Sequence, residues 1–152
     1  MNVHESEDPE LSLGYIVRDT DNLMTKALRT RLHPYGLTPG QWFVLRMLSL
    51  EEGVSQRELS RRVGTTEPST VAALRLLERD GMIRRVRNAA DRRTINVFLT
   101  DEARSLLATV HHCHLEVNAV AGGDIGADEL SGLRSTLRKI RDNLSRDVEA
   151  QR

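Results

Sequence analysis

Cysteine is almost absent from this sequence, since Cys113 is the single example among 152 residues. One cysteine cannot form a disulfide within the chain, and the first twenty residues contain no basic stretch followed by an apolar run that would resemble a secretion signal. No run of about eighteen apolar residues occurs, so a membrane-spanning helix is excluded on length. We therefore expect a cytoplasmic protein without membrane partners.

The sequence also lacks the short motifs of the common enzyme classes. It contains no glycine-rich phosphate loop, no paired-carboxylate motif and no nucleophile signature. We therefore expect a protein that is not an enzyme and that needs no cofactor. The length suits one domain with its own core, and the polar, acidic residues 1–9 predict a flexible tail before a single domain over residues 10–150.

Net charge is absent as well, because 22 basic residues balance 22 acidic ones. The distribution is uneven, however. Residues 57–93 contain ten arginines and five acidic residues, a net charge of +5, which leaves −5 on the rest of the chain. A local excess of arginine is typical of a surface that binds nucleic-acid phosphates. Charge alone leaves an ordinary solvated surface open as the alternative.

The spacing of apolar residues predicts a mainly α-helical chain with one small β-hairpin, an α+β fold. Helix start signals are strong at Thr38 and Thr66, each of which is followed by a proline in the first turn. Ser55 and Glu58 have the spacing of a capping box. The expected helices cover residues 11–33, 38–53, 55–64, 66–81, 100–122 and 128–148.

Apolar stripes indicate which helical side chains face a core. The last helix carries an almost regular seam with alternating steps of three and four, like a short coiled coil, and such a seam needs a partner helix. Its residues are Leu130, Leu133, Leu137, Ile140, Leu144 and Val148. The side chains expected to face inward in the second and fourth helices are Trp42, Phe43, Leu45, Leu48, Val71, Leu74 and Leu77.

Beyond Gly81 the pattern changes from helical spacing to alternation, which predicts a β-hairpin. Its first strand contains Ile83 and Val86, and its second spans residues 95–99. The connecting segment, about residues 87–93, is too long for a two-residue turn and places arginines at an exposed tip. Two short helices joined by a tight turn and followed by a basic hairpin suit DNA, with one helix in the major groove and the hairpin reaching an adjacent groove.

On these features the sequence resembles the MarR family of winged helix-turn-helix transcriptional regulators. The resemblance rests on Gly-Thr-Thr-Glu-Pro-Ser at 64–69, Leu-Glu-Arg-Asp-Gly at 77–81, and Asp-Arg-Arg at 91–93 ahead of Leu-Thr at 99–100. The match extends over about residues 11–148.

The resemblance implies a winged helix-turn-helix DNA-binding lobe over residues 37–100, with residues 67–80 as the recognition helix. It further implies a helical dimerisation domain built from residues 10–36 and 101–150. We therefore expect a repressor that binds a pseudo-palindromic double-stranded operator as a homodimer, with half-sites about one helical turn apart.

Burial of the apolar stripe leaves Ser69, Ala72 and Ala73 facing outward from the recognition helix. The alanines offer only methyl contacts, which match thymine methyl groups. Some relatives have an arginine where Ala72 stands, so specificity should shift toward the wing and the shape of the DNA.

At the wing tip, Arg92 is expected to enter an A/T-rich minor groove, while Arg93 pairs with Asp91 or touches a phosphate. Phosphate contacts that fix the register are expected from the third helix and the first strand, including Arg57, Arg61 and Arg85. The complete set of expected DNA-binding residues is Ser55, Gln56, Thr66, Glu67, Pro68, Ser69, Thr70, Ala72, Ala73, Arg75, Arg85, Arg87, Asp91, Arg92 and Arg93.

In the resembled family, small anionic or aromatic effectors bind near the first, second and fifth helices. We expect an aromatic carboxylate or its thioester to do so here, because rings can stack on its aromatic part and cations can meet its carboxylate. The expected ligand-binding residues are Tyr15, Arg18, Trp42, Arg46 and His114.

Two alternatives remain open from the sequence. Residues 111–114, His-His-Cys-His, suggest a metal- or redox-responsive regulator, but consecutive helical residues point in different directions, so no metal site and a buried Cys113 thiol are expected. A winged helix can also bind a protein instead of DNA, although the arginine-rich hairpin argues against that.

Overall fold

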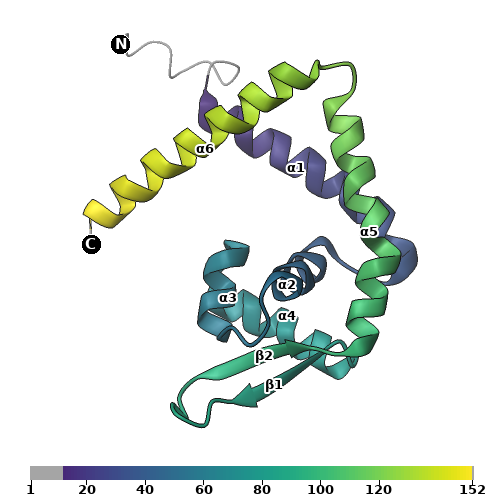
Figure 1. Cartoon of the computed structure of the whole chain (residues 1–152), viewed down its shortest axis with the longest axis vertical. Helices are drawn as coiled ribbons and strands as arrows, with labels where there is room; N and C mark the ends of the chain where they lie inside the picture. The colour runs from purple at the N-terminus through teal and green to yellow at the C-terminus, as the bar shows by residue number, and fades with distance from the viewer. Residues whose placement is uncertain (1–11, 152) are drawn as a thin grey trace. The chain divides into compact units, whose positions relative to one another are not determined.

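The computed structural model describes residues 12–151, drawn from α1 to α6 in Figure 1. The predicted tail over residues 1–9, and the expected start of the first helix at Leu11, lie outside the described residues. The chain divides into two compact units, with the boundary between Val117 and Asn118. The elements in chain order are α1 (Leu13–Leu32), the 3-10 helix η2 (His33–Tyr35), α2 (Pro39–Leu50), α3 (Gln56–Val63), α4 (Glu67–Arg79), β1 (Ile83–Arg87), β2 (Ile95–Leu99), α5 (Asp101–Gly122) and α6 (Ala127–Ala150).

The predicted helix start signals cap the helices of the first unit, with one correction. The side chains of Thr38, Ser55 and Thr66 each accept a hydrogen bond from a backbone amide in the first turn. Thr38 also forms a full capping box with Gln41. The capping box predicted at Ser55 is only half made, because the Glu58 carboxylate binds two arginines farther along α3.

The core of the first unit gathers apolar side chains from α1, α2, α3, α4, the hairpin and α5. Trp42, Leu45 and Leu48 are buried as predicted, but Phe43 is 40% exposed and the expectation that it faces inward is wrong. Residues 42, 45 and 48 follow one side of the helix, and Phe43 lies about 200° around the axis from Leu45.

The hairpin is antiparallel, and Arg85 lies opposite Val97 in its register. Val97 is fully buried, and its backbone bonds to the segment before α3, since it accepts from the amide of Gly53 and donates to the carbonyl of Val54. The inner edge of the wing is therefore fixed to the lobe. Ile83 is buried, whereas Val86, three residues farther along the strand and so on its opposite face, is 44% exposed.

The second unit contains the last residues of α5 and all of α6. No residue of α6 is buried. Four members of the predicted seam, Leu133, Leu137, Leu144 and Val148, are each at least 41% exposed in the single chain. The exposed seam agrees with the expectation that it needs a partner helix. Among residues 12–151, none of the helices has the length and apolar character needed to cross a bilayer.

Candidate nucleic-acid interface

The turn between α3 and α4 is set by a left-handed residue. Gly64 has φ +74°, and its amide and that of Thr65 both bond to the carbonyl of Ser60 at the end of α3. Thr66 then caps α4 by accepting from the amide of Ser69, and its hydroxyl also donates to the Ser69 hydroxyl at 2.9 Å. The first turn of α4 therefore starts at a fixed angle to α3, as in a helix-turn-helix.

The outer face of α4 is small and only weakly polar. Ser69, Ala72 and Arg75 are exposed, as are Glu67 and Pro68 in the first turn, while Ala73 is half-buried. Serine and arginine can bond to base edges or phosphates, and Ala72 offers a methyl group. Most of the side chains predicted to face a duplex are thus accessible to one.

Thr70 is the exception, and the prediction that it contacts DNA is wrong. Its side chain is 1% exposed and its hydroxyl lies 3.0 Å from that of Thr65. The buried stripe of α4 consists of Thr70, Leu74 and Leu77, with steps of four and three, whereas Val71 is only half-buried. A polar residue takes the inward position because Thr65 satisfies its hydroxyl.

The wing loop, residues 88–94, is held by two side chains. Asn88 accepts from the amides of Ala90 and Asp91, and the Asp91 carboxylate accepts from the amide of Arg93 at 3.0 Å and the hydroxyl of Thr94 at 2.7 Å. These bonds, that of Thr94 first, lower the pKa of Asp91. Asp91 therefore shapes the loop through the backbone of Arg93, and the predicted pairing with the Arg93 guanidinium is wrong.

The guanidinium groups at the tip have different environments. Arg87 donates to the backbone carbonyl of Arg92 at 3.0 Å and so supports the tip from the strand. Arg92 and Arg93 are exposed, and within residues 12–151 neither guanidinium has an ion pair. Two cations at the end of a fixed loop are therefore available to an anion.

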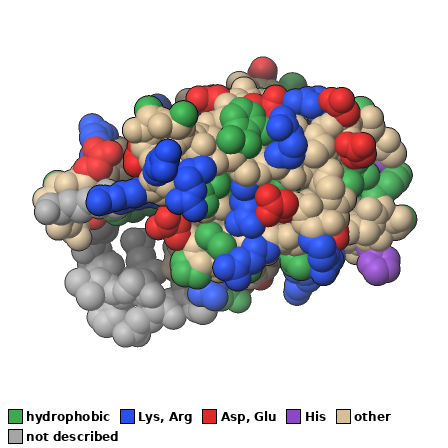
Figure 2. All heavy atoms as spheres, turned by 90° about the horizontal axis from the view of Figure 1, so that it is seen from below, with side chains coloured by type: hydrophobic (Ala, Val, Ile, Leu, Met, Phe, Trp, Pro, Cys, Tyr) green, Lys and Arg blue, Asp and Glu red, His purple; other side chains and the backbone are tan. Residues whose placement is uncertain are grey.

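A groove of about 360 Å³ connects the wing loop with the starts of α3 and α4. It brings together predicted residues that lie far apart in the sequence, including Ser55, Gln56, Glu67 and Arg93. Arg57 is also exposed here, but Arg61 is bonded to Glu58, whose pKa its guanidinium and that of Arg62 lower to about 2. Figure 2 shows blue Lys and Arg side chains spread over the underside of the molecule, with fewer acidic ones among them.

Arg85 is paired with a carboxylate, as Arg61 is, but its partner belongs to a different element. Its guanidinium forms an ion pair with Glu78 and also donates to Gln56, and 23% of its side chain is exposed. The sequence places it among the arginines of the hairpin and gives no sign of this pairing, because Glu78 belongs to the preceding helix.

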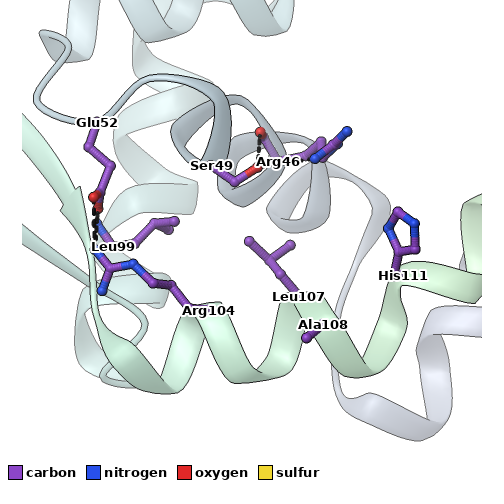
Figure 3. A pocket seen from close by; sticks show the side chains of 8 residues that line it. All are labelled: Arg46, Ser49, Glu52, Leu99, Arg104, Leu107, Ala108 and His111. Atoms are coloured by element: carbon purple, nitrogen blue, oxygen red, sulfur yellow. Dashed lines mark hydrogen bonds and ion pairs between the residues drawn. The ribbon is translucent and has the colours of Figure 1, made fainter.

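A second cavity, of about 300 Å³, lies between α2 and α5 (Figure 3). The side chains of the two helices face each other across it, and Arg104 binds both oxygens of Glu52 at 2.8 Å. Glu52 also accepts from the amide of Leu99 at the end of β2, at 2.7 Å. The bond from Arg104, followed by that from Leu99, lowers the pKa of Glu52. The lining residues are Arg46, Ser49, Glu52, Leu99, Arg104, Leu107, Ala108 and His111.

Arg46 alone among the five predicted ligand-binding residues lines this cavity. Trp42 is 6% exposed and packs at a tilt of 37° against the ring of His114, with 5.3 Å between the ring centroids. Burial lowers the pKa of His114. Tyr15 and Arg18 are exposed on α1. The sequence does not predict that Arg104, Glu52 and His111 line this cavity. Of these three, only His111 could have been found from the sequence, because it lies close to the predicted ligand-binding residue His114.

Cys113 is fully buried on the core stripe of α5, as expected, and burial raises the pKa of its thiol. Its sulfur lies 3.5 Å from the carbonyl of Arg31. Over residues 12–151, no three His, Cys, Asp or Glu side chains gather as a metal site would require. The burial of the thiol does not favour a redox-responsive regulator.

Known proteins share this arrangement. The model of the MarR family matches residues 35–94. The HTH-type transcriptional regulator TtmR of Methylorubrum extorquens is 33% identical over 141 residues, which are 91% of this chain and 71% of that protein. The structure of the transcriptional repressor CouR bound to a 23-mer DNA duplex is 28% identical, with a TM-score of 0.80 over 90% of this chain and 96% of that one. A mutant MarR from E. coli complexed with operator DNA has the same fold, with 20% identity and a TM-score of 0.80 over 92% of this chain and 99% of that one.

Proposed function

The chain belongs to the MarR family of transcriptional regulators, and we propose that it is a repressor that binds a pseudo-palindromic operator as a dimer and leaves it when an aromatic carboxylate or its thioester binds. Regulators of this family are not enzymes. The observation that carries the proposal is the groove that joins the wing tip, the start of α3 and the start of α4. In CouR, a structural relative at 28% identity, the protein is bound to a DNA duplex.

In this proposal α4 lies in the major groove with Ser69, Ala72 and Arg75 toward the bases. One hydroxyl, one methyl and one guanidinium can discriminate few base pairs. The wing then supplies much of the specificity, because Arg92 can enter a narrow A/T-rich minor groove, where the negative potential is strongest. Arg57 and Arg93 border the groove and bind phosphates, which fixes the register of the lobe on the duplex.

Because the side chains of one lobe discriminate few base pairs, specific binding requires two lobes and therefore a dimer. Two lobes related by a two-fold axis bind two half-sites about one helical turn apart and combine their affinities. The exposed seam of α6 offers the apolar surface that a second chain can cover. Residues 37–100 then form the reading lobe, and residues 10–36 and 101–150 supply the dimerisation helices.

The cavity between α2 and α5 supports the effector. Its volume lies at the lower end of the range for small-molecule pockets, about 300–1,000 Å³, which suits an acid with one aromatic ring. Arg104 is paired with both Glu52 and Asp101, whereas Arg46 has no ion pair among residues 12–151, so Arg46 gives the cavity a cation for an anion. For a thioester, only the aromatic acyl part would occupy the cavity.

Glu52 offers a route from this cavity to the wing. Its carboxylate accepts hydrogen bonds from both the Arg104 guanidinium and the backbone amide of Leu99 in β2. Exposed ion pairs of this kind contribute only about 0–1 kcal/mol, and the Glu52 and Arg104 side chains are 36% and 48% exposed. A carboxylate that takes Arg104 can therefore displace Glu52 at low cost, and β2 then loses a contact that helps to hold the hairpin.

The test uses a labelled DNA fragment from immediately upstream of the chain's own gene. We expect a mobility shift at nanomolar protein that an unlabelled copy of the fragment reverses and a scrambled duplex does not. Benzoate and its thioester are then titrated into the complex. Absence of a sequence-dependent shift would contradict the operator part of the proposal, and a complex that neither compound releases would contradict the effector part.

A further inference from the structure

Arg85 donates hydrogen bonds to neighbouring side chains through both its guanidinium and its backbone amide. Its Nε donates to the Glu78 carboxylate at 2.9 Å, its Nη2 pairs with the same carboxylate, and its Nη1 donates to Gln56 at 3.3 Å. The backbone amide of Arg85 also donates to Glu78, at 3.3 Å. The side-chain bonds use three of the five guanidinium N–H donors and pair its charge with a carboxylate, which leaves at most two donors for a phosphate.

The three residues belong to three separate elements of the DNA-binding face. Glu78 lies in the last turn of α4, Arg85 in the middle of β1, and Gln56 at the first position of α3. One guanidinium thus joins the recognition helix, the wing and the helix before it.

Arg85 lies where the hairpin is attached to the lobe, so its bonds to Glu78 and Gln56 can affect the direction of the wing. Opposite it, Val97 of β2 bonds to Gly53 and Val54, so both strands are anchored to the lobe at this level. Beyond it the hairpin extends toward the loop that starts at Asn88, about 10 Å farther at the usual rise of a strand. A small rotation at the anchor therefore becomes a larger displacement of the tip.

We propose that Arg85 is a positioning residue that, through Glu78 and Gln56, sets the angle between the wing and the recognition helix, and that it is not a phosphate ligand. This inference rests on the proposed DNA-binding function. It also replaces the expectation that Arg85 contacts a phosphate, because its guanidinium is paired with Glu78 inside the protein.

Glu78→Gln separates the two roles, because they predict opposite signs. If Arg85 positions the wing, loss of the carboxylate loosens it, and we expect operator affinity to fall by about tenfold, a change of ~1.4 kcal/mol, with the salt dependence unchanged. If Arg85 binds a phosphate, the same change releases a cation, so affinity rises and the dependence on salt becomes steeper. That second result would overturn the proposal.

Arg85→Gln gives an independent readout on operator and scrambled duplexes. We expect weaker operator binding, unchanged affinity for the scrambled duplex, and the wild-type slope of log K against log salt. A fall on both duplexes, with a slope smaller by about 0.9, is the signature of one lost phosphate contact and would contradict the proposal. Arg84→Gln is the matched control, because Arg84 carries the same charge, is exposed on the same strand and lies over the ring of Phe98, 6.0 Å from its centroid.

Two further measurements keep the result interpretable. Thermal unfolding of each variant identifies any loss of fold, and if Arg85→Gln unfolds, Arg85→Lys replaces it, since lysine keeps the charge but not the paired bonds to Glu78. The Arg85→Lys variant should bind operator more weakly than wild type if Arg85 positions the wing. It should bind equally well if only the charge at residue 85 contributes. If wild type itself fails to distinguish operator from scrambled DNA, the proposed function fails, and not the role of Arg85.

Discussion

Side chains at the wing tip divide into those that shape the loop and those that face solvent. Asp91 and Asn88 bond to backbone amides, and Arg87 bonds to the carbonyl of Arg92. The guanidinium of Arg92 is left exposed at the end of this frame. Pre-arrangement of the loop reduces the ordering cost when the tip enters a groove.

Arg92→Ala should therefore weaken operator binding by about 1–3 kcal/mol, since the tip loses the side chain that reads the minor groove. Fluorescence anisotropy with the labelled upstream duplex measures the change. Arg79→Ala is the matched control, because Arg79 carries the same charge in the same lobe but is paired with Asp80 at the far end of α4. Equal effects of the two substitutions would remove Arg92 from the interface.

At the scale of single residues, the sequence predicts chemistry better than pairing. It identifies Asp91 as a residue that shapes the loop, but not that the partner is the amide of Arg93 instead of its guanidinium. It places Thr70 at the surface because a hydroxyl is polar, and only the position of Thr65 in space explains its burial. Such partners depend on backbone conformation, which spacing along the chain does not reveal.

At the scale of elements, caps and turns carry most of the information. The predicted starts at Thr38, Thr66 and Thr100 fall within one residue of the observed helices, because threonine and the residues after it satisfy local hydrogen bonds. The short helix His33–Tyr35 was not predicted, since the expected first helix ends at residue 33 and the next begins at residue 38. The cavity was missed for another reason: Glu52 and Arg104 lie 52 positions apart and meet only when α2 and α5 pack.

Glu52→Gln tests the coupling between this cavity and the wing. The amide keeps an acceptor for Leu99 but weakens the bond to Arg104, so Arg104 becomes more available to a carboxylate. We expect benzoate to bind more tightly by up to about fivefold, the equivalent of an exposed ion pair of up to ~1 kcal/mol, as measured by titration calorimetry.

Glu51→Gln serves as the control for this experiment, because Glu51 is adjacent and exposed but pairs with Arg62. An unchanged affinity for benzoate in Glu52→Gln would show that Glu52 does not compete for the cavity. Tighter binding in both variants would point to a general effect of charge.

At the scale of the whole molecule, the account requires two chains. The sequence of α6 predicts a seam that needs a partner helix, and Leu133, Leu137 and Leu144 of that seam are exposed in the single chain. The identity of the partner surface depends on the second chain and is therefore beyond what one sequence pattern can specify.

Replacement of Leu137 and Ile140 by glutamine should dissociate the dimer, because it removes apolar burial from the middle of the seam. Light scattering should then give a mass near the 17.1 kDa of one chain, where wild type gives about twice that value. Operator binding should fall in parallel. A monomeric wild type that binds operator tightly would contradict the dimer.

The central claim is that an arginine-bearing face of this protein binds duplex DNA, and the affinity of wild type for its upstream duplex as a function of salt tests it most directly. Each phosphate contact contributes a slope of about −0.9 to log K against log salt. We expect a steep negative slope on that duplex and weaker binding to a scrambled one at every salt concentration. Binding that is absent, or that does not respond to salt, would contradict the account.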